Sequence, residues 1–415
     1  MLSRFRLPVL SVLLFAVAIV PSAAEPKSVD FSRLVVVGDS LSAGYQNSCL
    51  LGTQQVNSYA NLVAQRAGAN LQLPLIGEPG FPPCLVLIDP GPPPLVDLVS
   101  TAFGIRLDPT VRTRNLSVPG ARVGDALDAA PSNGFHGLFG LPFAELHAAV
   151  LQGHGGVPRS QVDLAIELEP TALIVWLGGN DVLWAAIGGD PIFVTPEAVF
   201  RAGYEDMLAR LAATGAAMLV ANIPDATTIP FLTAAEAVEE IAGVPMAVFG
   251  LAPGDYVTPL AWRFVLTGAP LPDGVVVDAA ELAQIQTAID GFNEIIAEQA
   301  ALHGAALVDM NAVLRFVSQF GVVVGGRRLT ADFLGGMFTL DGIHPTNTGH
   351  AVMANEFIRG FNRAFGAGLR PYSTREIEAI MDADPLVFDS TGNPPWSPTA
   401  LEVLRDLDVI GAGAF

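Results

Sequence analysis

The chain has 415 residues, of which 51% are hydrophobic and 15% are charged, and its formal net charge is -20. The high apolar and low charged fractions exclude an intrinsically disordered chain and predict a large buried core. The few basic residues form no stripe or cluster, so binding to nucleic acid or to another anionic polymer is not expected.

The N-terminal segment has the pattern of an export signal. Two arginines precede the apolar run Leu7–Val20, and the small residues of Ser22–Ala24 suit a signal peptidase. We expect residues 1–24 to be removed, which predicts a secreted or periplasmic protein. A retained membrane anchor is the alternative, but the run is short for a bilayer span of roughly 20 apolar residues and stops at Pro21. No stable membrane span is expected after signal removal.

Strand and helix patterns alternate along the rest of the chain. Five short apolar, β-prone runs are each followed by a turn or a helix signal. These runs are Leu34–Val37, Val111–Leu116, Ala172–Leu177, Ala217–Asn222 and Ala305–Asp309. Amphipathic stretches between them, such as Pro196–Thr214 and Asp278–His303, predict helices, and Asp278 with Glu281 forms a capping box. The pattern predicts a parallel sheet covered on both faces, in which ligands bind at the carboxyl ends of the strands.

Three long stretches interrupt this alternation, at residues 77–110, 131–161 and 225–278. Connections of this length are usually functional or carry elements of their own. No break in composition marks a second domain, so we expect one domain over residues 25–367 with these insertions. The C-terminal extension 368–415 is expected to be either an extra helical layer packed on the domain or a loose appendage.

The chain contains two cysteines, Cys49 and Cys84, and both follow the export signal. An even number of cysteines in an exported chain favours one disulfide, which would close the loop between them. Two free buried thiols are the alternative, because the distance between cysteines cannot be read from sequence.

A serine stands where the first apolar run ends, in the segment Gly38-Asp39-Ser40. The chain must turn there into the next helix, so the Ser40 hydroxyl is expected to be exposed. The first amides of that helix would face the group that Ser40 attacks, and their partial positive charge can stabilise an oxyanion. An ordinary helix cap is the alternative, since Ser and Asp are both favoured as caps.

A carboxylate and an imidazole follow late in the chain, at Asp341 and His344. A serine hydroxyl becomes a good nucleophile when an imidazole takes its proton, and the imidazole needs an acceptor for its other N–H. Pro345 disfavours helix at His344, so both residues are expected on a loop before a helix that begins near Asn347. For His344 alone, a core or cap histidine is the more common role.

Two further turns provide candidate hydrogen-bond donors for an oxyanion. Asn180 follows two glycines after the third apolar run, and its side-chain amide is a neutral donor. Gly120 follows the second run and offers its backbone N–H. Capping of a turn by Asn or Asp is the alternative role for such segments. Asp39 and Asp181, which flank the candidate site, are expected to hold the turns through local hydrogen bonds.

Taken together, these segments resemble the four sequence blocks of the GDSL/SGNH hydrolase family. The blocks are GDSLS at Ser40, NLSVPGA at Gly120, GGND at Asn180 and DGIHP at His344, in the family's order within about residues 35–357. The resemblance implies a flavodoxin-like, three-layer α/β/α sandwich with a five-stranded parallel sheet.

The resemblance also implies a mechanism of two-step acyl transfer. Ser40 would be the nucleophile, His344 the base and Asp341 its orienting carboxylate. The backbone N–H groups of Ser40 and Gly120 and the side-chain amide of Asn180 would form the oxyanion hole. No metal or organic cofactor is required, and His344 and His350 have no further ligand at zinc spacing.

The expected activity is that of a lipase or esterase acting on a small-molecule or lipid ester. Three apolar loop segments, Phe81–Leu87, Phe135–Phe143 and Ile229–Leu251, either line an acyl groove or lid or simply pack on the scaffold. A groove would favour medium-to-long acyl chains. A carbohydrate acetyl esterase is the alternative, weakened by only 5 Tyr and 4 Trp. A non-catalytic binding module on a hydrolase scaffold is the alternative from another class.

Overall fold

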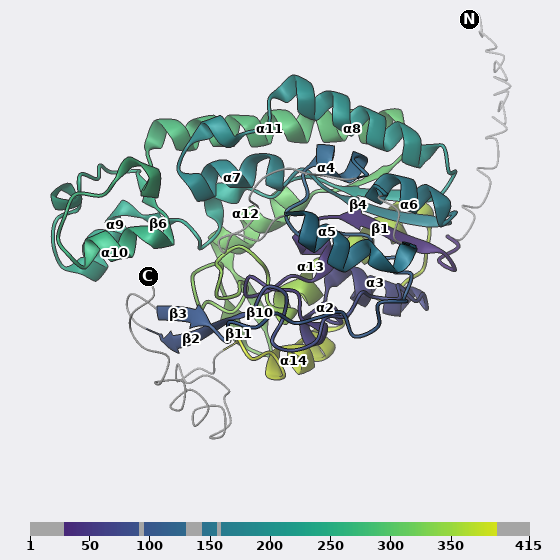
Figure 1. Ribbon diagram of the computed structural model, residues 1–415, viewed down its shortest axis with the longest axis horizontal. Coiled ribbons are helices and arrows are strands. Elements are labelled where there is room, and N and C mark those ends of the chain that lie inside the picture. Colours follow the sequence, from purple (N-terminus) through teal and green to yellow (C-terminus); the bar gives the residue numbers. More distant parts are fainter. Residues whose placement is uncertain (1–28, 91–94, 130–142, 156–158, 388–415) are drawn as a thin grey trace, which may run out of the picture.

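The computed structural model describes residues 29–90, 95–129, 143–155 and 159–387 (Figure 1). The expected export signal at residues 1–24 lies outside these ranges, as do residues 388–415 of the C-terminal extension. No helix within the described ranges combines the length and the apolar character needed to cross a lipid bilayer.

A parallel sheet forms the centre of the molecule. Its strands are β1 (Leu34–Gly38), β4 (Ala172–Trp176), β5 (Ala217–Ala221) and β9 (Ala306–Val308), in the order β1-β4-β5-β9. Every residue of β1 and β4 is buried, which is why both sequences are continuous apolar runs and do not alternate with polar residues. Four of the five predicted runs therefore form strands, at the predicted positions to within two residues.

The remaining predicted run, Val111–Leu116, does not form a strand. Asn115 makes one parallel bridge with Val36 of β1, and backbone hydrogen bonds join this segment and the residues just after it to Val36 and Gly38, so it runs along the edge of the sheet. The Thr113 hydroxyl also accepts from the Asn115 N–H at 3.0 Å and donates to the Asn115 carbonyl at 2.9 Å. Such local side-chain bonds compete with regular strand geometry. The described sheet thus has four strands where five were predicted.

Helices lie on either side of the sheet (Figure 1). On one side are α6 (Gln161–Glu167), α8 (Glu197–Ala212) and α11 (Ala279–Leu302), and on the other are α3 (Tyr59–Ala67) and α13 (Asn347–Phe365). The remaining helices that bear on the site are α1 (Ser40–Ala43), α2 (Gly52–Gln55), α4 (Val123–Leu127), α7 (Asn180–Gly188) and α12 (Met310–Phe320).

The long helix α11 begins as its sequence predicts. The Asp278 side chain accepts from the N–H groups of Ala280 and Glu281, and the Glu281 carboxylate accepts from the Asp278 N–H, which completes the capping box. Its apolar residues recur at helical spacing and are buried, and Phe292 among them stacks on Phe200 of α8 with ring centroids 3.9 Å apart.

The insertion at residues 77–110 contains the antiparallel pair β2 (Leu85–Asp89) and β3 (Leu95–Leu98). A disulfide joins Cys49 to Cys84 at the start of this pair, with the two Cα atoms 4.9 Å apart. The predicted pairing is therefore present, and it ties the insertion to the segment that follows α1. In the insertion at 131–161, the described part includes α5 (Phe143–Leu151).

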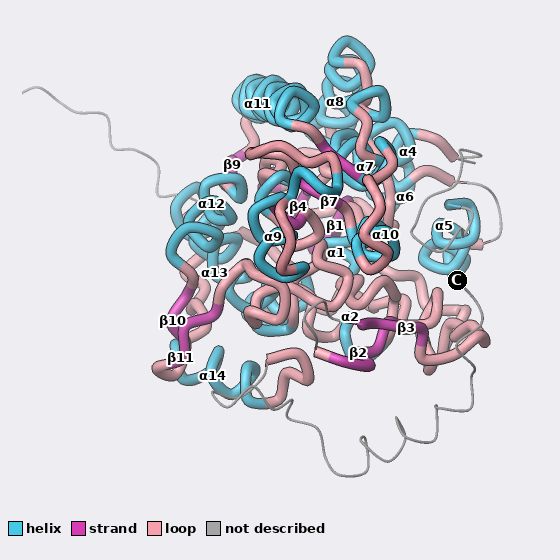
Figure 2. The backbone as a smooth tube through the Cα atoms, turned by 90° about the vertical axis from the view of Figure 1, so that its left-hand side faces the viewer, coloured by secondary structure: helices cyan, strands magenta, loops and turns pink. Residues whose placement is uncertain are grey.

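The insertion at residues 225–278 has a hydrophobic cluster of its own. Three short strands, β6 (Thr233–Ala234), β7 (Tyr256–Val257) and β8 (Val276–Val277), form an antiparallel sheet. Helices α9 (Ala235–Ala242) and α10 (Trp262–Val265) belong to the same unit, which lies at the end of the molecule that faces the viewer in Figure 2. Most apolar side chains of this insertion are consequently used to hold the insertion itself together.

The described part of the C-terminal extension packs on the rest of the chain. It contains α14 (Thr374–Asp382), which lies against α13 and near the hairpin of β10 (Val322–Val324) and β11 (Arg327–Leu329). Glu376 of α14 accepts from the Arg66 guanidinium of α3 at 2.6 Å. Up to residue 387, the structure therefore corresponds to the packed alternative for this extension.

Candidate active site

Ser40 is the first residue of α1, directly after β1. The Asp39 side chain caps this helix by accepting from the Leu41 N–H at 3.0 Å, and Gly44 ends the helix in the left-handed conformation. A side chain at Gly38 would meet the Ser42 hydroxyl at 2.5 Å, so the tight turn requires glycine there. The backbone N–H of Ser40 has no acceptor within the described residues, as expected for the first turn of a helix.

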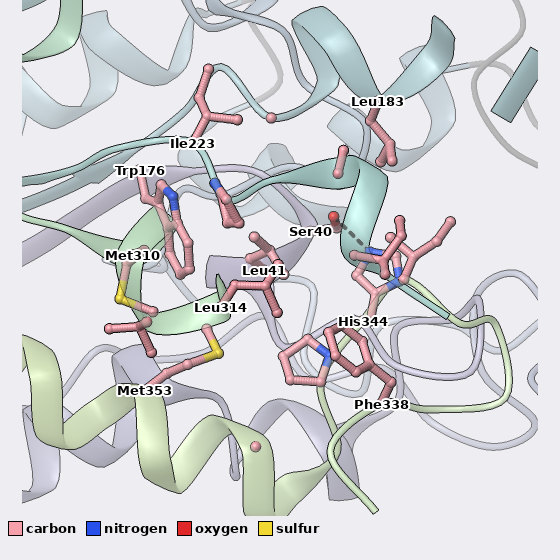
Figure 3. A pocket seen from close by; sticks show the side chains of 18 of the residues that line it. Ser40, Leu41, Trp176, Leu183, Ile223, Met310, Leu314, Phe338, His344 and Met353 are labelled. Carbon is pink, nitrogen blue, oxygen red and sulfur yellow. Dashed lines mark hydrogen bonds between the residues drawn. The ribbon is translucent and has the colours of Figure 1, made fainter. Parts of the chain in front are cut away.

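The structure brings Ser40, His344 and Asp341 into one hydrogen-bonded chain. The Oγ of Ser40 lies 2.8 Å from Nε2 of His344 (Figure 3). Nδ1 of His344 lies 2.9 Å from Oδ2 of Asp341. All three side chains are buried. Asp341 and His344 lie on the loop before α13, as the sequence predicts, and α13 begins at Asn347.

The Asp341 carboxylate is fully hydrogen-bonded. Its Oδ1 accepts from the Thr339 hydroxyl and from the backbone N–H groups of Ile343 and His344, each at 2.9 Å. Its Oδ2 accepts from the Ser48 N–H at 2.7 Å as well as from His344. Burial by itself would raise the pKa of Asp341, but the neighbouring His344 and these hydrogen bonds lower it to about 2. Asp341 is therefore ionised at neutral pH.

Sequence reasoning missed the segment Tyr45–Cys49, which wraps around the Asp341–His344 loop. Ser48 contributes only its backbone N–H, and the Asn47 N–H donates to the Thr339 hydroxyl at 3.2 Å. The Tyr45 ring packs edge-on against the His344 ring with centroids 4.9 Å apart. A backbone donor has no side-chain signature in a sequence. The cysteine pair was the available hint, because the disulfide fixes Cys49 next to this donor.

Asn180 and Gly120 lie at two neighbouring turns. Asn180 begins α7, and its Nδ2 donates to the Ala121 carbonyl at 3.1 Å and to Oδ2 of Asp39 at 3.4 Å. Gly120 has a φ of 82°, which favours glycine, and its N–H has no acceptor in the described parts of the chain. Asn180 lines the same pocket as Ser40 and His344, whereas Gly120 is not among the lining residues.

Two more buried carboxylates hold the turns of the site. Besides capping α1, Asp39 accepts from Asn180, and Asp181 accepts from the Val123 N–H at 3.0 Å. Burial raises the pKa of Asp39 to about 7, against the lowering effects of the Leu41 N–H and His344. Burial likewise raises the pKa of Asp181 to about 6. Both residues have the turn-holding role expected from the sequence, and the bond from Asn180 to Asp39 is an addition to it.

A pocket of about 110 Å³ opens beside Ser40, His344 and Asn180 (Figure 3). Its other lining residues are almost all apolar and come from α12, α13, the ends of strands and helices, and the loops around Ile223 and before α13. The three apolar loop segments considered for an acyl groove contribute few residues to the lining of this pocket. Ile229 is the only residue of Ile229–Leu251 that lines this pocket, and none comes from Phe81–Leu87. The segment Phe135–Phe143 lies almost entirely outside the described residues.

His350 is a packing residue in this structure. It is fully buried, and its Nδ1 accepts from the Tyr59 N–H at 3.2 Å. Burial lowers its pKa to about 3, so the ring is neutral. Within the described ranges, no three side chains among His, Cys, Asp and Glu are placed to hold a metal ion.

Comparisons with known proteins give one family match. A family model described as GDSL-like Lipase/Acylhydrolase matches residues 34–357. Comparison with curated proteins gives no match.

Several solved structures are similar to the chain at low sequence identity. A putative GDSL-like lipase from Parabacteroides merdae ATCC 43184 is 10% identical, with 84% of this chain and 100% of that chain covered and a TM-score of 0.38. The psychrotrophic esterase EstA from Pseudoalteromonas sp. is 12% identical, with 80% and 97% covered and a TM-score of 0.36. An acetylxylan esterase from Geobacillus stearothermophilus is 12% identical, with 79% and 93% covered and a TM-score of 0.34.

Proposed function

The chain belongs to the GDSL-like lipase/acylhydrolase family and is a carboxylic ester hydrolase, and we propose that Ser40, His344 and Asp341 are its catalytic triad. The observation that carries the proposal is the unbroken hydrogen-bond chain from the Ser40 hydroxyl through the His344 ring to the Asp341 carboxylate. The ionised state of Asp341 supports the role of orienting carboxylate, since it fixes the His344 proton on Nδ1 and leaves Nε2 free to accept.

The reaction then takes two steps. Ser40 Oγ attacks the ester carbonyl carbon while its proton moves to Nε2 of His344. The same proton passes to the alcohol oxygen, the bond from carbon to that oxygen breaks, and the acyl group remains on Ser40. A water molecule attacks the acyl-enzyme with His344 again as base, and the acid leaves as the Ser40 hydroxyl is restored.

Three donors are proposed to stabilise the tetrahedral oxyanion: the N–H groups of Ser40 and Gly120 and the Asn180 amide. The two backbone N–H groups have no acceptor among the described residues, which supports this role. Both protons of the Asn180 amide are already bonded, to Ala121 and Asp39. Asn180 therefore has to exchange one of these bonds for the oxyanion, and the longer bond to Asp39 is the one we propose it gives up.

Replacing Asn180 by Ala should lower kcat by about 10²–10³ with little change in KM, because an oxyanion donor acts mainly in the transition state. Steady-state kinetics on a soluble p-nitrophenyl ester measures both constants. Asn180→Asp is the matched control for shape, since it keeps the size of the side chain and removes the donor, and it should lose at least as much kcat. An effect confined to KM would make Asn180 a substrate-binding residue instead.

We also propose the domain organisation and the export of the chain. Helices on either side of the sheet support a three-layer α/β/α domain over residues 25–367 with the three insertions. The disulfide between Cys49 and Cys84 supports export by a signal at residues 1–24, because such bonds persist in oxidising compartments.

Hydrolysis of p-nitrophenyl butyrate by the purified protein tests the proposed activity directly. We expect turnover together with a covalent adduct on Ser40 when an alkyl fluorophosphonate is added, because the oxygen of an activated serine attacks phosphorus and displaces fluoride to give a phosphonate ester. The adduct is located by mass spectrometry of peptides. Release of acetate from acetylated xylan without hydrolysis of the butyrate ester would replace the acyl-ester proposal by the carbohydrate esterase alternative.

A further inference from the structure

The pocket at Ser40 continues beyond the proposed triad into a channel between two helices. Four residues of α12 line it at positions three and four apart, so they share one face of that helix: Met310, Val313, Leu314 and Val317. Residues of α13 with the same spacing line the opposite wall: Gly349, Val352 and Met353. Two helices of the fold therefore form much of the channel wall, and loop residues such as Ile223, Met337 and Phe338 complete it.

The two ends of this channel differ in chemistry. Figure 3 shows Trp176, Met310 and Met353 at the end away from the Ser40–His344 pair, with Leu314 between the two ends. The polar lining residues all belong to the Ser40 end, and no Lys or Arg is among the lining residues to pair with a charged group. Trp176 donates its indole N–H to the Asn222 carbonyl at 3.0 Å, so that polar group is already satisfied. The far end thus suits a hydrocarbon chain and offers nothing to a sugar or an anion.

We propose that this channel is the acyl-chain subsite and that Leu314 and Met353 limit it to medium-length, unbranched acyl groups of roughly six to eight carbons. The inference rests on the proposed function, because it takes Ser40 as the point where the acyl carbonyl is held. In the sequence analysis, the candidate lining of an acyl groove was the insertion loops, with packing on the scaffold as the alternative for them.

Two dimensions set the length limit. The stripe from Met310 to Val317 extends about 10 Å at about 1.5 Å of helix rise per residue. An extended chain advances about 1.3 Å per carbon for C–C bonds of about 1.5 Å, which gives about eight carbons over that length. The pocket volume of about 110 Å³ is near the roughly 150 Å³ of an engineered cavity that binds benzene in another protein, which points to about six carbons.

Rates along an acyl series should report this limit. Burial of one methylene corresponds to an increase in kcat/KM of up to about fourfold. We expect kcat/KM for p-nitrophenyl esters to rise at least about tenfold from acetyl to its maximum, at hexanoyl or octanoyl, and to fall again by dodecanoyl. A maximum at acetyl, or no fall by dodecanoyl, would contradict the proposal.

Opposite changes at Leu314 test the assignment of the wall. Leu314→Trp should fill the channel and lower the ratio of octanoyl to acetyl kcat/KM by at least about tenfold, whereas Leu314→Ala should move the maximum to a longer chain. Gln319→Trp places the same bulk on the exposed face of α12 and should leave the profile of the native protein unchanged. Misfolding cannot move the optimum in two directions. An unchanged optimum in both Leu314 variants would overturn the proposal.

Binding without turnover separates a failure of the subsite from a failure of the proposed activity. Calorimetry with 1-octanol should give a dissociation constant at least about tenfold larger for Leu314→Trp than for the native protein and for Gln319→Trp. If no ester is hydrolysed but 1-octanol binds in this pattern, the activity is wrong and the channel stands. If esters are hydrolysed and 1-octanol affinity is the same in all three proteins, the channel assignment is wrong.

Discussion

Replacement of Ser40 by Ala is expected to lower kcat for ester hydrolysis by about 10⁶, the order of magnitude for removing the nucleophile of a serine hydrolase triad. Without Oγ no acyl-enzyme can form, and His344 has no serine hydroxyl from which to accept a proton. The remaining rate would come from a water molecule in the same pocket. Initial rates on p-nitrophenyl butyrate, measured at enzyme concentrations high enough to detect slow turnover, give the ratio of the two kcat values.

The fold should survive this change, because the hydroxyl of Ser40 bonds only to His344 among the described residues. The melting temperature of Ser40→Ala should therefore remain close to that of the native protein. Ser42→Ala is a suitable control in the same short helix, since the Ser42 hydroxyl bonds to the Tyr59 hydroxyl at 2.6 Å and not to the triad. Ser42→Ala should still hydrolyse the ester and still take the fluorophosphonate label. Activity of Ser40→Ala comparable to that of Ser42→Ala would rule out Ser40 as nucleophile.

The positions of these candidate residues could be predicted because buried parallel strands have a strong sequence signature. Strands β1 and β4 are covered on both faces, so each is an uninterrupted apolar run, and the polar residues after it must lie at the carboxyl end. Ser40 and Asn180 are the first residues of the helices that follow these two strands. The proline after His344 placed Asp341 and His344 on a loop in the same way.

Features that depend on tertiary contacts could not be predicted. The run at Val111–Leu116 has strand composition and pairs with β1 only over a short stretch, and Thr113 and Asn115 add local hydrogen bonds that compete with regular strand geometry. The apolar loops were expected either to line an acyl groove or to pack on the scaffold, and residues such as Phe249 and Val257 pack against one another in the 225–278 insertion. Periodicity identifies apolar residues that must be buried, but it does not say against which partner. The faces of α12 and α13 that line the pocket were not singled out in the sequence for this reason.

A second large effect is expected at Asp341, the proposed orienting carboxylate. Asp341→Asn should lower kcat by about 10⁴, the order found when the aspartate of another serine hydrolase triad is changed to asparagine. The new side chain has one acceptor oxygen and one NH₂ group, whereas Asp341 accepts five hydrogen bonds through two oxygens. The donors that bond to Oδ1 or those that bond to Oδ2 must therefore lose their acceptor, and the position of the new NH₂ group determines which of the two sets this is.

If the NH₂ of the new asparagine took the place of Oδ1, the backbone N–H groups of Ile343 and His344 and the Thr339 hydroxyl would face a donor. In the place of Oδ2, it would face the Ser48 N–H and Nδ1 of His344, of which only Nδ1 can become an acceptor by changing tautomer. This second arrangement sacrifices fewer bonds, and it moves the His344 proton to Nε2, where the ring can no longer accept the proton of Ser40.

Asp384→Asn is a control for the loss of stability when a buried Asp is replaced by Asn. Asp384 is also buried, and it accepts from the N–H and the hydroxyl of Thr348, each at 2.8 Å. Asp341→Asn and Asp384→Asn should both lower the melting temperature, because each leaves buried donors unpaired. Only Asp341→Asn should lower kcat by orders of magnitude, since only Asp341 selects the tautomer of His344. Equal kcat values for the two variants would mean that another acceptor orients His344, and Asp341 would then be a structural residue of the loop.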